Sequence, residues 1–170
     1  TTYSGVITGL SGLTKIGTGT FTLSGANTYV DTTIVNEGSL VLTGGLALAN
    51  SNAVELNGTA NLTVATAETI GSLAGTADTT ATLTATLTTG GNNTGTTMAG
   101  DMSGAGGLTK EGTGDMVLSG TNSYAGTTTI NAGELTLQGG TAIVDTGTVV
   151  INGGTLDVDT AETIGSLAGV

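Results

Sequence analysis

The sequence has no cysteine, proline, tryptophan or histidine, and aromatic residues make up only 2% of its 170 residues. Its only basic side chains are Lys15 and Lys110. Without cysteine there is neither a disulfide nor a thiolate nucleophile, and without histidine a catalytic triad and most metal sites are excluded. We therefore expect no enzymatic activity, no cofactor and no metal site.

The formal net charge of −11 excludes another group of partners. Nucleic acids and anionic membrane surfaces are bound through basic patches, and this chain has none. No run of 18 apolar residues is present, so we expect no membrane-spanning helix. The chain starts at Thr1 without a charged and apolar leader, so we expect no signal peptide within it, as in a mature chain or an excised segment.

What the sequence does contain is 31 glycines, many threonines and a mean hydropathy of +0.29. Threonine and valine favour strands, and glycine favours turns. With so few aromatics, the core must be thin and filled by Leu, Ile, Val and Ala. The composition predicts an all-β protein with many tight corners.

A long stretch of the sequence occurs twice. GLTKIGTGTFTLSGANTY at Gly12 returns as GLTKEGTGDMVLSGTNSY at Gly107, an offset of 95 residues (from 12 to 107). AETIGSLAG at Ala67 returns unchanged at Ala161, an offset of 94 (from 67 to 161), and residues 76–95 occur once. We therefore predict repeat unit 1 at 1–95, including a unique Thr-rich segment at 76–95, and a partial unit 2 at 96–170, together forming one continuous solenoid domain.

Within each unit, apolar residues alternate with polar ones, which is the pattern of half-buried strands. Leu62 and Val64 alternate in this way, and Leu156 and Val158 repeat them. The predicted core comprises Phe21, Leu23, Leu40, Leu42 and Leu56, and in the second copy Met116, Leu118, Leu135, Leu137 and Ile151. Short repeated strands favour a β-solenoid over a sandwich, with four or five turns of roughly 20 residues in each unit.

The two copies share the pattern GLTKxGTGxxxLSGxNxYxxTTxxNxGxL. This pattern resembles the autotransporter-associated β-strand repeat of passenger regions in bacterial type V secreted surface proteins. The resemblance implies a right-handed parallel β-helix that is exported through the outer membrane and displayed at the cell surface, as one part of a larger protein. The copies differ at Val30–Asp31, where the second has Ala125–Gly126.

The polar residues of the motif are interpreted as structural. Asn27 and Asn122 each precede a tyrosine by two residues, and we expect them to bond their own neighbours at a corner. Tyr29 and Tyr124 would cap the edge of the core with their hydroxyls in water. Lys15 and Lys110 lie at strand ends, where they would serve solubility or pair with an acidic neighbour.

Two further patterns carry alternative hypotheses. Asp157 and Asp159 lie on one strand face and could form a carboxylate pair, although a solvated face is the favoured interpretation. The run ATLTATLTT at Ala81 places Thr82, Thr84, Thr86 and Thr88 on one face if it forms a single strand, as in ice-binding arrays.

The function favoured by the sequence is a structural stalk or spacer of an adhesin or autotransporter passenger at the outer-membrane surface or outside the cell. The main alternative is a subunit of a self-assembling extracellular filament, and an ice-binding or carbohydrate-binding solenoid is a distant one. Expected partners are neighbouring repeats or copies stacked end to end, with host or cell-surface ligands as further candidates. Nucleic acid binding and membrane insertion are not expected.

Overall fold

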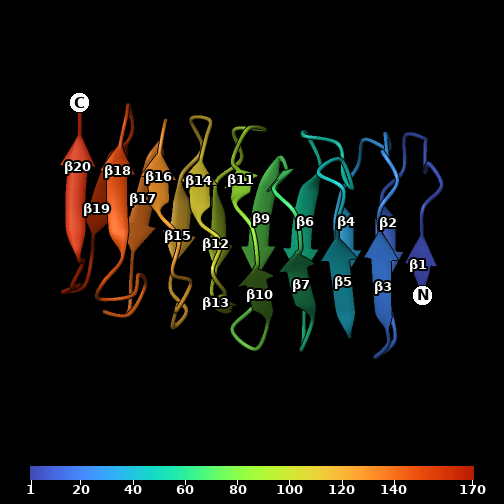
Figure 1. The fold of residues 1–170 in the computed structure, drawn as a ribbon, viewed down its shortest axis with the longest axis horizontal. Coiled ribbons are helices and arrows are strands. Elements are labelled where there is room, and N and C mark those ends of the chain that lie inside the picture. The colour runs from blue at the N-terminus through green and yellow to red at the C-terminus, as the bar shows by residue number, and fades with distance from the viewer.

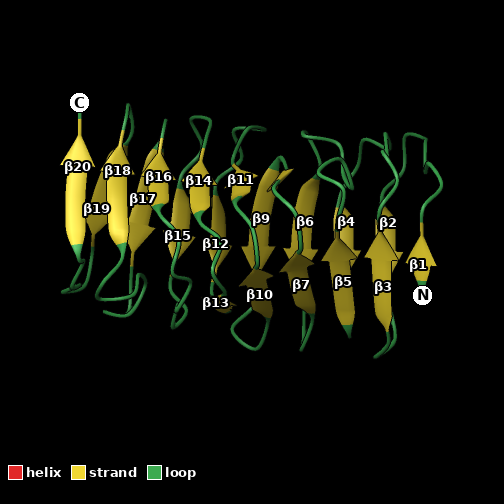
Figure 2. Cartoon of the chain, viewed as in Figure 1, coloured by secondary structure: helices red, strands yellow, loops and turns green.

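The alternating segments form twenty short strands and no helix in the computed structural model, which describes residues 1–170. Loops and turns join every pair of strands (Figure 2). Corners form where the backbone can adopt a left-handed conformation, as at Gly38 (φ 67°) and its equivalent in the second copy, Gly133 (φ 66°). These positions favour glycine because a Cβ atom is strained there.

The strands stack into three parallel sheets, which we call sheets 1, 2 and 3. Sheet 1 contains β1 (Thr2–Tyr3), β3 (Thr20–Leu23), β5 (Ser39–Leu42), β7 (Asn61–Val64), β10 (Thr80–Leu83) and β13 (Asp101–Ser103). Sheet 2 contains β2 (Leu13–Lys15), β4 (Thr33–Val35), β6 (Ala53–Leu56), β9 (Ser72–Gly75), β12 (Thr96–Met98), β15 (Met116–Leu118), β17 (Glu134–Leu137) and β19 (Thr155–Val158). Sheet 3 contains β8 (Glu68–Thr69), β11 (Leu87–Thr89), β14 (Leu108–Lys110), β16 (Thr128–Ile130), β18 (Thr148–Ile151) and β20 (Ser166–Gly169).

The chain winds as a β-solenoid of about eight turns, and the turns follow one another along the rod in sequence order (Figure 1). Residues paired in neighbouring turns lie 18 to 23 positions apart, as Thr148 with Ser166 (166 − 148 = 18) and Gly75 with Met98 (98 − 75 = 23). The repeating element of the structure is therefore a turn of about 20 residues.

This turn length has a consequence for the two sequence copies. Because 95 residues is not a whole number of such turns, equivalent strands fall on different sheets. The LTK strand β2 lies in sheet 2, whereas the same letters form β14 in sheet 3. Likewise β3 lies in sheet 1 and its equivalent β15 in sheet 2. Each strand of the second copy thus lies on a different face of the solenoid from its equivalent in the first copy.

The Thr-rich run at Ala81 is not a single strand. It forms β10 in sheet 1, a bend at Thr84 and Ala85, and then β11 in sheet 3. The expectation that Thr82 and Thr88 share one face is therefore wrong. The run turns a corner of the solenoid because each side of a turn holds only a few residues.

The interior is one continuous cluster of 29 buried apolar residues. Successive turns place them in columns, such as Leu40 beside Leu62 and Leu118 beside Leu137. Two tyrosines are included and tryptophan is absent, so the column stays thin. Each turn buries its apolar residues against the turns on either side, as in other repeat proteins.

Candidate functional site

The structure places most of the predicted core residues inside the solenoid. Those that are buried in the apolar cluster are Leu23, Leu40, Leu42, Leu56, Met116, Leu118, Leu135 and Leu137. Phe21 and Ile151 are half-buried against it. Leu156 is also half-buried, and Val158 is 47% exposed because β19 is the edge strand of sheet 2. Val158 is in register with the buried Leu137, so it keeps the inward position expected from the sequence and is exposed only because no further turn covers it.

The motif asparagines form hydrogen bonds to the neighbouring turns. The sequence analysis expected them to bond residues of their own corner, and this expectation is wrong. Asn27 Oδ1 accepts a hydrogen bond from Ile7 N at 2.7 Å, one turn back. Its Nδ2 donates to Ala47 O at 2.7 Å, one turn ahead. Asn122 repeats the arrangement with Met102 N and Ala142 O, at 2.7 and 2.8 Å. Both asparagines lie outside the strands, so each side chain supplies the hydrogen bonds between turns that a sheet would otherwise provide.

The motif tyrosines lie inside the core, and their hydroxyls do not reach water. Tyr29 and Tyr124 are each 1% exposed. Each hydroxyl shares a hydrogen bond of 2.6 Å with the threonine four residues later, Thr33 or Thr128. Burial raises the pKa of both phenols, that of Tyr124 to about 12. The expectation of solvated hydroxyls is thus wrong, because the following threonine satisfies the buried group.

The two lysines are also buried, which corrects their assignment to the surface. Lys15 Nζ donates to the carbonyl oxygens of Ile16, Gly17 and Glu37, at 3.1, 2.5 and 3.0 Å. Lys110, which is 1% exposed, repeats this with the carbonyl oxygens of residues 111, 112 and 132. Burial lowers the pKa of Lys110, while nearby carboxylates oppose this shift. Each ammonium thus joins the corners of two successive turns.

Sequence reasoning missed two glutamates that bind backbone N–H groups: Glu68, which is buried, and Glu162, which is half-buried. Glu68 accepts hydrogen bonds from Ala47 N at 3.2 Å and Leu48 N at 2.9 Å, so it holds the same loop that Asn27 reaches. Glu162 binds the equivalent loop in the second copy, through the backbone N–H groups of residues 142 and 143. The signal was available: both glutamates belong to the exactly repeated AETIGSLAG, and Glu68 has the same strand parity as the buried Ile70.

Glu68 gives the stability a pH dependence. Burial raises the pKa of this carboxyl, and the two N–H donors only partly oppose the shift. The folded chain therefore binds this proton more tightly than the unfolded chain, and protonation stabilises the fold as the pH falls through the raised pKa. We expect the free energy of unfolding of the wild type to rise relative to Glu68→Gln as the pH falls from neutral.

Urea denaturation over a series of pH values measures this difference. Glu55→Gln, which removes an exposed carboxylate from β6, is the matched control. A wild-type advantage that stays constant over the whole pH series would contradict the prediction.

The carboxylate pair suggested by the sequence lies on an exposed face at the end of β19. Asp157 and Asp159 are both exposed, and Asp159 accepts a hydrogen bond from Gln138 Nε2 at 2.8 Å. No group of three or more acidic side chains lies close enough together to hold a metal ion. No helix that could cross a membrane is found either.

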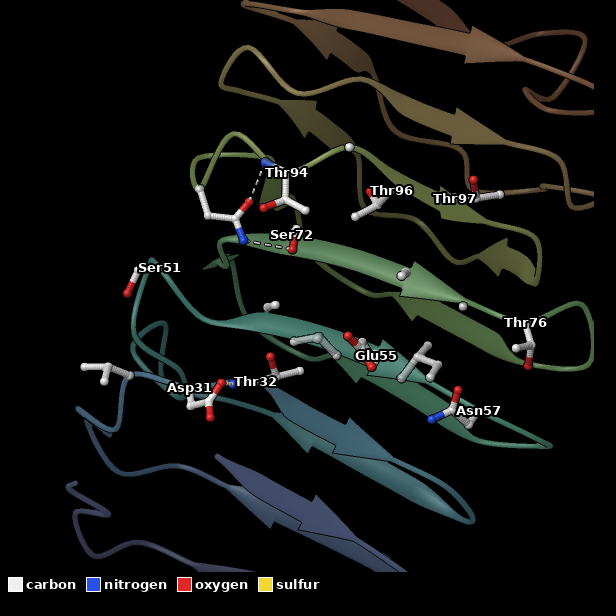
Figure 3. A pocket seen from close by; sticks show the side chains of 18 residues that line it. Asp31, Thr32, Ser51, Glu55, Asn57, Ser72, Thr76, Thr94, Thr96 and Thr97 are labelled. Atoms are coloured by element: carbon white, nitrogen blue, oxygen red, sulfur yellow. Dashed lines mark hydrogen bonds between the residues drawn. The ribbon is translucent and has the colours of Figure 1, made fainter. Parts of the chain in front are cut away.

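One groove on the outside of sheet 2 is a candidate binding site (Figure 3). Its volume is about 690 Å³, and Ala53, Ala74 and Gly75 contribute small residues to its lining. Glu55 lies near its middle and Asp31 at one side (Figure 3). These residues come from β6, β9 and the loop before β4, so three successive turns build the groove.

The opposite side of the groove comes from the unique segment and the residues just after it. The chain at 92–97 leaves a hollow because β12 pairs with β9 through one residue pair only, Met98 with Gly75. Asn92 Nδ2 donates to Ser72 Oγ at 3.0 Å, and Asn92 Oδ1 accepts from Thr94 N at 3.1 Å (Figure 3). These bonds fix the amide at the rim of the groove.

Comparison with known proteins identifies the repeated segments. Residues 13–42 and 108–137 each match the model of the passenger-associated-transport-repeat family. Both segments begin at the strand that carries the buried lysine and include the Asn-x-Tyr corner. No curated protein and no solved structure matches the chain significantly. Two segments of the chain are thus similar to the passenger-associated-transport-repeat, in agreement with the resemblance seen in the sequence.

Proposed function

We propose that this chain is a structural stalk segment of a surface-exposed autotransporter passenger, located outside the cell. The observation that carries the proposal is the single apolar column that continues through about eight parallel turns, with passenger-associated repeats in both halves. The number of turns in such a solenoid sets the length of the rod, because each further turn adds one strand spacing and extends the existing core. The 95-residue units, wound right-handed, would lengthen the stalk by whole copies.

A surface-display fusion tests this function. The chain is placed between an outer-membrane anchor and an N-terminal epitope, in one or in two tandem copies. The epitope should move outward by about 38 Å with the second copy, from eight strand spacings of about 4.8 Å. Electron tomography of a gold-labelled epitope measures the distance. An unchanged height, or a chain that never reaches the surface, would contradict the stalk function.

A second candidate function is an extracellular filament built of copies stacked end to end. It is favoured by apolar residues exposed at the two ends of the rod: Leu10 (86%) and Ile16 (74%) at one end, and Leu167 (59%) and Val158 (47%) at the other. Unpaired edge strands at such ends favour pairing with another chain. Light scattering over increasing protein concentration should then show growing rods, whereas a constant monomer mass would contradict assembly.

A further inference from the structure

The groove on sheet 2 has a lining of defined chemistry. Seven of its 18 lining residues carry a hydroxyl group, two carry an amide and two a carboxylate, so it offers both donors and acceptors of hydrogen bonds. None is basic or aromatic. We propose that this groove binds a short neutral oligosaccharide, whose hydroxyls donate to Asp31 and Glu55 and exchange hydrogen bonds with the surrounding threonines.

The two carboxylates of the groove are not needed to build the rod. The second copy replaces Asp31 by Gly126 and Glu55 by Val150 and still forms the equivalent strands β16 and β18. The fold therefore requires neither carboxylate. The amide of Asn92 comes from the segment that occurs once in the sequence. The two carboxylates and the Asn92 amide of the groove therefore have no counterpart in the second copy of the repeat.

The lining discriminates between classes of ligand. Two carboxylates without a basic partner disfavour an anionic ligand. A basic peptide side chain could meet the carboxylates, but it only donates hydrogen bonds. Sugar hydroxyls both donate and accept, so they can satisfy carboxylates, amides and threonine hydroxyls at once. The volume lies in the range of about 300–1,000 Å³ that is usual for small-molecule sites.

The experiment uses chemical-shift mapping of the isotope-labelled 16.3 kDa chain. The probes are maltotriose, cellotriose, mannotriose and N-acetylchitotriose, each titrated to millimolar concentration. At least one should shift the backbone amides of residues 53–57, 72–76 and 92–97 selectively. A trigalacturonate and a tetralysine peptide test the anionic and basic alternatives.

Variants borrowed from the second copy test the two carboxylates. Asp31→Gly and Glu55→Val should together weaken binding at least about tenfold, because they remove charge-assisted hydrogen bonds. Asp157→Val, on the outer face of β19, is the matched control and should bind like the wild type. Unchanged circular dichroism of all variants keeps the comparison valid.

Three results would overturn the proposal: no shift with any of the four neutral sugars, shifts spread outside the groove, or tighter binding of the peptide or trigalacturonate at the same amides. None of these results bears on the stalk function, because the proposal does not depend on it. The epitope-height measurement would stand in each case.

Discussion

Leu118→Asp is expected to abolish cooperative folding of the turns around β15. Leu118 is fully buried and lies in register between Met98 and Leu137. Its replacement would place a carboxylate in the apolar column, and both lysines of the chain are already bound to carbonyl oxygens. The cost of such an unpaired charge, several kcal/mol, is comparable to a typical total stability of about 5–15 kcal/mol.

Circular dichroism and hydrogen exchange measure this effect. We expect a lower melting temperature and lost protection in β12, β15 and β17, because each turn depends on its neighbours. Val117→Asp is the matched control. It also introduces an aspartate, one residue away and on the outer face beside Thr97 and Thr136. It should change the free energy of unfolding by less than about 1 kcal/mol. Equal losses in the two variants would refute the inward position of Leu118.

Tyr124→Ala is expected to destabilise the fold by about 3–5 kcal/mol, the usual range for removing a buried aromatic ring. Tyr124 is one of the two largest fully buried side chains, and the thin core holds no second layer that could fill the cavity. Urea denaturation gives the difference from the wild type.

The phenylalanine variant separates the ring from the hydroxyl. Tyr124→Phe keeps the volume and removes only the hydrogen bond to Thr128, for an expected loss of about 1 kcal/mol. If both variants lost the same free energy, the hydroxyl and not the packing of the ring would dominate, which would contradict the prediction for Tyr124→Ala.

Strand alternation by itself predicts the inward position of the two motif lysines. In the LTK of each motif, the lysine has the same parity as Leu13 or Leu108, so alternation alone places it inward. The general preference of lysine for the surface argued against this position. The structure resolves the conflict because three carbonyl oxygens surround each ammonium, and two of them belong to the corner that the lysine itself precedes.

The candidate groove could not be predicted from the sequence. Asp31, Glu55 and Asn92 lie in separate turns, and no motif connects them. Their proximity depends on the lengths of the turns between them, each of which can gain or lose a residue at a corner.

The sequence by itself determined the all-β class, the repeated corners, the apolar column and the repeat family, because strand alternation and turn glycines are local patterns. Only the tertiary structure decided which sheet each strand joins, which turns the asparagines and glutamates connect, and where a groove opens. Those features depend on contacts about 20 residues apart. Their register follows from turn lengths of 18 to 23 residues added along the chain, as with Thr148 and Ser166 or Gly75 and Met98. The strands of the same motif therefore lie in different sheets in the two copies.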